Sequence, residues 1–538
     1  MTTPSSSKRS SGDPSPRDVS AVRFDAVTVV SKAALVGITV IVLGFLAATR
    51  LLYPLDGDGA LFLTAARIID DGGVLYVDFW DVKQPGIFYF YWLAGNIFEF
   101  TFLGVQFFQL VYWAVIGTAV CILIRPYFVH PWIAVLVPFV FLATYYAYAG
   151  TNHHAQVEII ASGPLFLSAI CLAKATECTG SDRNWRLILA GSFGAFVILL
   201  KIALAPILLA FFVVYLVSGL RNGRAINRIA LDGAIVLFGG TLVLTVVVVA
   251  LFLNGGLTGA IETAFLIGPE WARAAPQAPL SRLFKGGVSF VGSFGAWIGL
   301  AVLGLASLRS LTRRPLAAYC CAWILGALVC ILIQRFSWWA YHWQLLYLPT
   351  AVLAALGADC GLSWLGNRWK IGERAKVLVA LSVLAPFLFT YSQVLADRRA
   401  LIKEHRTEIS QSDYAGFRAA VSPRYSRAAE IVASLPGDVQ HQSIYVMGDP
   451  LIYVIHNARQ AIPVHGWALE FFSPRDWARM MAELEVSNTQ AIFISSDYRQ
   501  LVNEKASEIS DFLASRYLRG PELDTGDWYF VKQVQRNE

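Results

Sequence analysis

Residues 33–59 read AALVGITVIVLGFLAATRLLYPLDGDG, an apolar run that ends in a short acidic turn. The apolar part is close to the length at which a helix crosses the roughly 30 Å hydrocarbon core of a bilayer. The turn places Asp56 and Asp58 directly after that helix. Carboxylates beside membrane helices are costly and usually functional. The stretch therefore predicts a membrane protein with a chemical site at one face of the membrane.

The composition of the whole chain indicates a polytopic α-helical membrane protein. It has 538 residues, 56% hydrophobic and 15% charged, with a mean hydropathy of +0.55. The net charge of +6 does not indicate nucleic-acid binding, because excess Lys and Arg normally hold cytoplasmic loops in place. About eleven apolar spans of near-bilayer length are expected, at 32–49, 101–124, 132–149, 157–174, 186–200, 202–219, 230–253, 286–308, 316–333, 341–361 and 375–393.

Basic residues alternate between the loops as the positive-inside rule requires. The weakest spans are 186–200 and 202–219, which are short and separated by Lys201. They could form one re-entrant element, but merging them would invert every later loop and remove the alternation. We therefore predict two helices, a cytoplasmic N-terminus, and a loop over 50–100 on the outer face of an inner or plasma membrane.

Three regions follow from the composition. Residues 1–28 are Ser/Pro-rich and basic and read as a disordered cytoplasmic tail. Residues 29–393 form the membrane domain, and residues 394–538 have the composition of a soluble α/β domain, which the topology places outside the cell. In that domain the patterns predict strands at 443–447, 491–495 and 528–532, and helices at 474–485 and 503–517.

Asp56 and Asp58 have a structural and a functional interpretation. The apolar stretch 60–69 is expected to form an interfacial helix, and a carboxylate at its start would cap it and offset its dipole. Glycines beside both acids instead allow a tight turn close to a ligand. Two acids in one short loop, with Lys83 nearby, favour the functional interpretation.

Lys83 opens the motif Lys83-Gln84-Pro85-Gly86, which leads into an aromatic-rich segment. Aromatic side chains at a membrane interface are usually anchors, and Pro85 fits the first turn of a helix. The segment 86–96 is therefore expected to be a second interfacial helix. Lys83 would either reach the lipid headgroups or bind a substrate phosphate.

Four further candidates lie on the same side of the predicted topology. Glu158 is either a solvated helix-end residue or a site carboxylate, and Lys201 is either a surface residue or a functional membrane cation. Arg335 and His342 flank an aromatic cluster and suit phosphate recognition. The pair His153-His154 does not indicate a metal, because adjacent histidines diverge on a helix and no third ligand follows at standard spacing. The cysteines show neither a disulfide nor a metal pattern.

These motifs together resemble the first outer loop of GT-C glycosyltransferases of the protein O-mannosyltransferase and aminoarabinose-transferase type. The resemblance rests on the order Asp58, then Gly72-Gly73 and Tyr76, then Asp78-Phe79, then Lys83 with Pro85-Gly86, and it spans about residues 30–360. It implies a GT-C-like fold and a sugar donor linked to polyprenyl phosphate. Two departures stand out: Gly59 follows Asp58 where the family often has Glu, and Gln84 replaces the first Pro of Lys-Pro-Pro.

In the family that this chain resembles, the acid at the Asp58 position is the catalytic base and basic residues bind the donor phosphate. The resemblance thus implies a catalytic pair of Asp58 and Asp56, donor contacts from Lys83, Lys201, Arg335 and His342, and Glu158 as an acceptor or site carboxylate. A single displacement would invert the anomeric centre, and a divalent cation stays open as a cofactor. The acceptor would be a glycan, a lipid or a protein.

Two other classes of function compete with the transferase. A transporter or flippase of a polyprenyl-linked substrate would place polar residues at mid-membrane, in repeats with broken helices. Here the ionisable residues gather at one face and no repeat is visible, which favours the enzyme. A non-catalytic assembly factor that keeps the fold is the third hypothesis.

Overall fold

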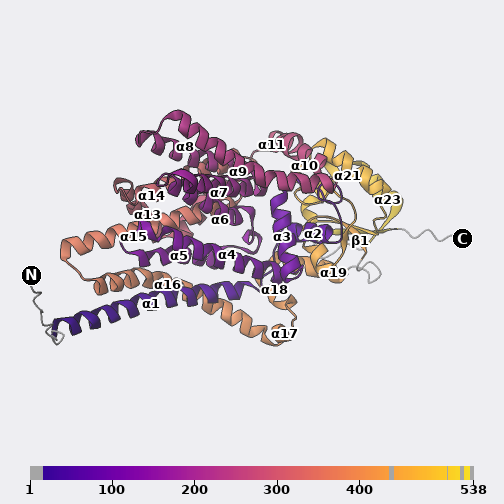
Figure 1. Ribbon diagram of the computed structural model, residues 1–538. Coiled ribbons are helices and arrows are strands. Elements are labelled where there is room, and N and C mark those ends of the chain that lie inside the picture. The colour runs from indigo at the N-terminus through magenta and orange to yellow at the C-terminus, as the bar shows by residue number, and fades with distance from the viewer. Residues whose placement is uncertain (1–15, 435–441, 506, 521–525, 533–538) are drawn as a thin grey trace, which may run out of the picture.

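The computed structural model describes residues 16–434, 442–505, 507–520 and 526–532. A bundle of long helices occupies one end, and a small α/β domain packs on the other end (Figure 1). The principal helices of the bundle are α1 (Pro16–Arg50), α4 (Phe102–Ile124), α5 (Leu136–Tyr148), α6 (Val157–Ala175), α7 (Gly180–Leu200), α8 (Ala205–Arg221), α9 (Ile226–Leu253), α12 (Leu280–Phe294), α13 (Ala296–Gly304), α14 (Arg314–Ile333), α15 (Tyr347–Trp369) and α16 (Glu373–Glu404).

Ten of the described helical segments are long and apolar enough to cross a membrane, or eleven if one bent pair counts as a span. The predicted spans are confirmed in number and position, with one difference in shape. Where the sequence predicts one helix over 286–308, α12 and α13 meet at an angle of 87°. The bend lies at Gly295, whose φ of +49° is a backbone conformation that favours glycine.

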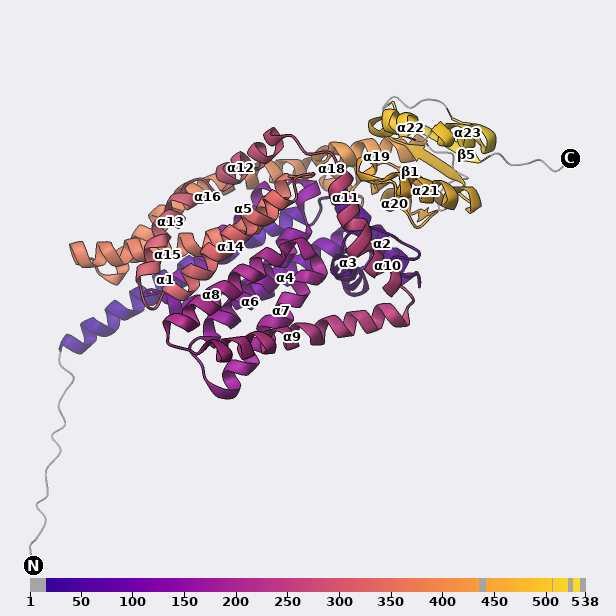
Figure 2. The ribbon, with the colours of Figure 1, turned by 90° about the horizontal axis from the view of Figure 1, so that it is seen from above.

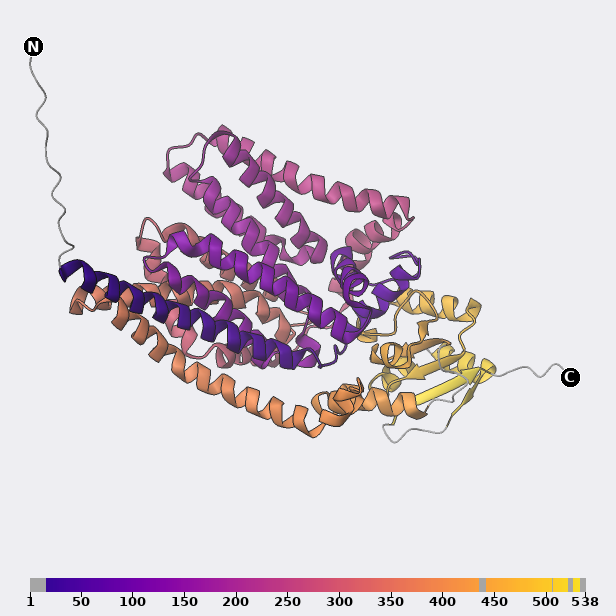
Figure 3. The same cartoon turned by 60° about the horizontal axis from the view of Figure 1, so that its bottom comes forward.

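The N-terminal helix also differs from expectation. α1 begins at Pro16, so helical backbone starts within the segment 1–28 that the composition predicts to be disordered. Residues 1–15 of that segment lie outside the described residues. α1 and α16 lie side by side along one edge of the bundle (Figure 3). Arg50 and Arg398 both donate to the carbonyl of Tyr146, at 2.9 and 2.6 Å, and so satisfy the last turn of α5.

The loop over 50–100, predicted to be the first outer loop, contains two helices, α2 (Asp58–Asp70) and α3 (Pro85–Phe98). Residues 59–66 of α2 are all buried, so this helix is enclosed instead of lying on a surface. Gly86 lets α3 reach the end of α7, because a Cβ there would lie 2.6 Å from the carbonyl oxygen of Leu199. Lys201 interrupts the helical backbone between α7 and α8. The amide of the next residue, Ile202, donates to the side-chain oxygen of Gln84 at 3.1 Å. The Lys83 motif and Lys201 are thereby held next to each other.

The C-terminal domain contains a five-stranded sheet in the order β2-β1-β3-β5-β4. Its elements are α17 (Arg406–Ser410), α18 (Ala415–Val421), α19 (Pro423–Ser434), β1 (Ser443–Met447), α20 (Leu451–His456), β2 (Arg459–Gln460), α21 (Pro474–Val486), β3 (Ala491–Ile494), α22 (Arg499–Lys505), α23 (Ser507–Arg516), β4 (Tyr517–Arg519) and β5 (Trp528–Lys532). β1 is parallel to β2 and β3, whereas β5 is antiparallel to β3 and β4. The predicted α/β class is confirmed. The domain sits beside α2, α3, α10 (Leu257–Glu262) and α11 (Gly268–Ala274) (Figure 2).

Candidate active site

A cavity of about 1140 Å³ lies between the end of the helix bundle and the C-terminal domain. The membrane domain contributes the first outer loop, the start of α6, the break between α7 and α8, and η7 (Ala340–Leu346). The C-terminal domain contributes α19 and the loops that follow β1, β2 and β3. Most of the charged candidates from the sequence line this one space: Asp58, Lys83, Glu158, Lys201 and His342.

Asp58 is the first residue of α2 and stands at the wall of the cavity. Gly57 precedes it with φ +57°, which turns the chain sharply into the helix. The Asp58 carboxylate is 15% exposed. Its Oδ1 accepts from the indole nitrogen of Trp467 at 3.0 Å and lies 3.6 Å from Lys83 Nζ, while Oδ2 accepts from the hydroxyl of Tyr341 at 3.4 Å. The carboxylate is thus oriented and still open to a ligand.

Asp56 has a different environment, although only one residue separates it from Asp58. Its side chain is buried and accepts from Thr151 at 2.5 Å and from Ser422 at 2.7 Å. Burial raises the pKa of Asp56 above its usual value, against the effect of these two hydrogen bonds. Asp56 does not belong to the described residues that line the cavity. It ties the first loop to η3 (Thr151–His153) and to the start of α19.

Lys83 is held by two carboxylates. Its Nζ lies 3.2 Å from Asp81 Oδ2, and its backbone amide donates to Asp81 Oδ1 at 2.7 Å. Burial alone would raise the pKa of Asp81, but Lys83 and His465 lower it below its usual value. Burial would likewise lower the pKa of Lys83, but Asp58 and Asp81 raise it. Both groups are therefore charged at neutral pH, and Lys83 presents a fixed cation to the cavity.

A second charged group also lines the cavity. Glu158 in the first turn of α6 is buried and accepts from Lys201 Nζ at 2.6 Å. His342 Nε2 lies 3.6 Å from the same carboxylate oxygen. The other ring nitrogen of His342, Nδ1, has no hydrogen-bond partner among the described residues. Glu158 is thus a buried residue of the cavity lining and not a solvated helix end.

One sequence candidate, Arg335, does not join this arrangement. Arg335 is exposed, and the cavity is lined by its neighbours Gln334 and Phe336 and not by Arg335. The adjacent histidines diverge: His153 lines the cavity, whereas His154 is buried against Tyr145. No three His, Cys, Asp or Glu side chains of the described residues form a group that could hold a metal ion.

The C-terminal domain supplies residues that sequence reasoning missed. Asp449 follows β1 and accepts from the backbone amide of Gly57 at 3.4 Å and from Arg424 at 3.2 Å. Burial raises the pKa of Asp449 to about 6, against the effect of Arg424. The carboxyl ends of neighbouring parallel strands are where α/β sheets bind ligands. The turn Gly448-Asp449-Pro450 after a predicted strand was therefore an available signal.

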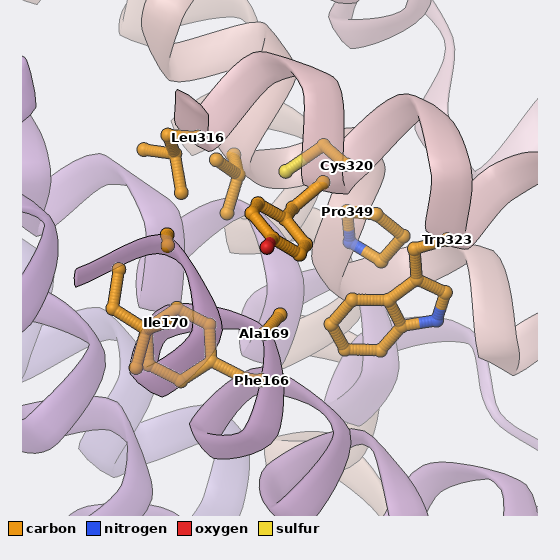
Figure 4. Close-up of a pocket in the computed structure, with 10 residues that line it drawn as sticks. Phe166, Ala169, Ile170, Leu316, Cys320, Trp323 and Pro349 are labelled. Carbon is orange, nitrogen blue, oxygen red and sulfur yellow. The ribbon is translucent and has the colours of Figure 1, made fainter. Parts of the chain in front are cut away.

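A second, much smaller pocket of about 10 Å³ lies within the bundle. Figure 4 shows Phe166, Ala169 and Ile170 of α6 facing Cys320 and Trp323 of α14 across it. Its described lining holds no charged side chain, and its volume is about that of one water molecule. It is a packing gap, and the large cavity is the candidate site.

The arrangement is that of a GT-C-like fold: a bundle of membrane helices, a loop with two helices after the first of them, and a C-terminal domain over the cavity. The chain is similar to crystal structures of ArnT from Cupriavidus metallidurans, one bound to undecaprenyl phosphate and one in the apo state. Both have a TM-score of 0.55 and 13% identity, and the alignments cover 93% and 95% of this chain and 98% of ArnT.

The oligosaccharyltransferase AglB from Archaeoglobus fulgidus, in complex with an inhibitory peptide and a dolichol-phosphate, aligns over 93% of this chain and 75% of AglB. The TM-score is 0.43 and the identity 14%. No family model and no curated protein matches the sequence. ArnT and AglB are GT-C superfamily members, so the similarity to ArnT confirms the fold that the sequence motifs predict.

Proposed function

We propose that this protein is a membrane glycosyltransferase that moves a sugar from a polyprenyl-phosphate donor to a hydroxyl group of a glycan, lipid or protein acceptor. The observation that carries the proposal is the pairing of Asp58 with Lys83, 3.6 Å apart, on one wall of the cavity. A transfer from a lipid phosphate needs a base for the acceptor hydroxyl and a cation for the departing phosphate. This wall holds both.

In this reaction Asp58 takes the proton of the acceptor hydroxyl as its oxygen attacks the anomeric carbon. The bond between that carbon and the phosphate oxygen breaks, and polyprenyl phosphate leaves with the bonding electrons. Lys83 and Lys201, which both line the cavity, stabilise the charge that develops on the phosphate. Asp56 is buried and is not among the described residues that line the cavity, which favours one inverting displacement over a covalent intermediate on that acid.

The fold supports a lipid-borne donor. ArnT, to which this chain is similar over most of its length, has been crystallised with undecaprenyl phosphate. The charged groups of the cavity lie where the helices meet the C-terminal domain, and they include residues of that domain. A transporter site at mid-membrane would not need such a cover.

The test is transfer by the purified protein. It is incubated in detergent or liposomes with radiolabelled polyprenyl-phosphate sugars and a membrane extract as the source of acceptor, with and without a chelator. The expected result is label that moves to a polar or lipid product and is absent with Asp58→Asn. The chelator arm decides whether a divalent cation is needed. Flipping of labelled lipid across liposomes without transfer would contradict the enzyme and support a transporter.

We also propose that the cavity faces the outside and the N-terminus the cytoplasm. Single cysteines at the exposed positions Val77, Val486 and Leu311 test this in a cysteine-free background. Val77 in the first outer loop and Val486 in the C-terminal domain should react with an impermeant thiol reagent on intact cells. Leu311, between α13 and α14, should react only after lysis. The reverse pattern would overturn the orientation.

A further inference from the structure

The 463–468 loop of the C-terminal domain is attached to both domains through its backbone. On the membrane side, the amide of Trp80 donates to the carbonyl of Pro463 at 2.9 Å, and Trp80 pairs with Val464 in a parallel bridge. On the sheet side, the amide of Gly448 donates to Gly466 at 3.0 Å. A Cβ on Gly466 would lie 2.1 Å from the carbonyl oxygen of Val446, so glycine lets the loop press onto β1. The loop is therefore a fixed bridge to the first outer loop.

His465 in this loop is buried and has a defined tautomer. Its Nδ1 accepts from the backbone amide of Trp467 at 3.1 Å. In the neutral ring the proton then sits on Nε2. Nε2 lies 3.1 Å from Asp81 Oδ2, and the ring stacks on Phe79. His465 thus places its Nε2 beside the carboxylate that holds Lys83, in a close contact that lacks the alignment of a hydrogen bond.

Asp81 connects the two domains within the site. Its Oδ2 faces both His465 Nε2 and, at 3.2 Å, Lys83 Nζ, while Oδ1 accepts the backbone amide of Lys83. With the carboxylate fixed from the side of the C-terminal domain, the lysine has one preferred position. Without His465, Oδ2 of Asp81 would keep Lys83 Nζ as a partner but would lose its contact with the C-terminal domain.

Trp467 contacts Asp58, the other member of the Asp58–Lys83 pair. Its indole nitrogen donates to Asp58 Oδ1 at 3.0 Å, and the ring edge would be 3.1 Å from a Cβ on Gly57. The guanidinium of Arg424 lies 5.5 Å from the centre of the ring and covers it. One short loop therefore contacts Asp58 directly and reaches Lys83 through Asp81.

We infer that His465 and Trp467 are positioning residues that set the catalytic geometry of the membrane domain from the C-terminal domain: His465 fixes Lys83 through Asp81, and Trp467 fixes Asp58. This inference rests on the proposed function. It assigns the C-terminal domain a part in the reaction centre, so that the membrane domain holds a complete site only while the 463–468 loop is seated.

The first experiment measures binding of undecaprenyl phosphate by the full-length protein in detergent. His465→Leu replaces the imidazole by an apolar side chain of similar size, removes the polar nitrogen beside Asp81 and should weaken binding about tenfold. His465→Gln keeps a polar nitrogen near the Nε2 position and should restore most of the affinity. In a Lys83→Ala background, His465→Leu should have no further effect, because its action passes through Lys83.

The second experiment measures turnover of the labelled donor. Trp467→Phe keeps the ring but removes the indole N–H, and should lower kcat about tenfold with undecaprenyl phosphate affinity unchanged. The matched control is Trp477→Phe, a buried tryptophan of α21 outside the cavity lining, which should leave kcat unchanged.

The outcomes separate the two proposals. Wild-type protein that does not bind undecaprenyl phosphate overturns the proposed donor and the inference with it. Wild-type binding that His465→Leu leaves intact overturns the role of His465 alone, as does an equal loss in the Lys83→Ala background. A Trp467→Phe effect no larger than that of Trp477→Phe overturns the role of Trp467.

Discussion

Two charged clusters can be compared along α15: Tyr341 in η7, just before this helix, contacts Asp58, and Asp359 lies near the middle of the helix. One surrounds Asp58 and opens on the cavity. The other surrounds Asp359, which is buried and lies 2.7 Å from both Arg313 Nη2 and His130 Nδ1. Two backbone amides also donate to Asp359, at 2.9 and 3.0 Å.

The two clusters contain the same kinds of residue but serve different purposes. Each oxygen of Asp359 meets a side-chain partner and a backbone amide, which leaves little capacity for a ligand. Asp58 has longer contacts, of 3.0 to 3.6 Å, and a partly exposed carboxylate. A saturated carboxylate holds helices together, whereas an oriented but unsaturated one can take a proton. Substitutions at the two sites should therefore fail in different ways.

The largest effect is expected from Asp58→Asn. Asparagine keeps the size and much of the hydrogen bonding but takes no proton from a hydroxyl. General-base catalysis is worth about 10²–10⁴-fold, so kcat should fall by that amount while the thermal unfolding midpoint in detergent stays close to wild type. Asp56→Asn is the matched control and should cost less activity. If Asp56→Asn costs more, the base is Asp56.

Asp359→Asn should show the opposite pattern. Removing the charge leaves Arg313 without its carboxylate partner at 2.7 Å, and breaking a buried ion pair costs about 3–5 kcal/mol. The thermal unfolding midpoint should fall clearly, while kcat of the protein that stays folded should be near normal. If Asp359→Asn has normal stability and low activity, the proposed difference between the two clusters is wrong.

Lys83→Ala is expected to act on donor binding. A hydrogen bond to a charged group is worth roughly 1.5–3 kcal/mol, so affinity for undecaprenyl phosphate should fall by about 10- to 100-fold. The measurement is a binding titration in detergent beside an unfolding curve. Unchanged affinity with a collapse in stability would make Lys83 a structural residue, as Arg313 is in the other cluster.

The smallest effect concerns pH. The pKa of Asp449 is about 6 in the folded protein and 3.8 without the fold, so the native state holds the proton more tightly. The contribution of Asp449 to the free energy of unfolding is therefore fully present below about pH 4 and is lost as the pH rises through about 6. In Asp449→Asn, the fall in Tm between low and neutral pH should be smaller than in the wild type by a few degrees. An unchanged slope in the variant would place the pH dependence elsewhere.

The sequence alone determined the membrane helices. The length and hydropathy of a segment are enough to predict a membrane-spanning helix, because each helix must match the bilayer by itself. The C-terminal strands were also predictable from local patterns. Short motifs on one predicted membrane face brought together five residues that line one cavity: Asp58, Lys83, Glu158, Lys201 and His342. The bend at Gly295 was not visible, because an isolated glycine does not reveal its φ angle.

Only the tertiary structure separated Asp56 from Asp58 and left Arg335 outside the cavity. The sharp turn at Gly57 directs the two acids to different partners, Ser422 for one and Trp467 for the other. Those partners lie more than 300 residues away along the chain. No local pattern encodes such a pairing, because it arises when the C-terminal domain folds and packs onto the first outer loop.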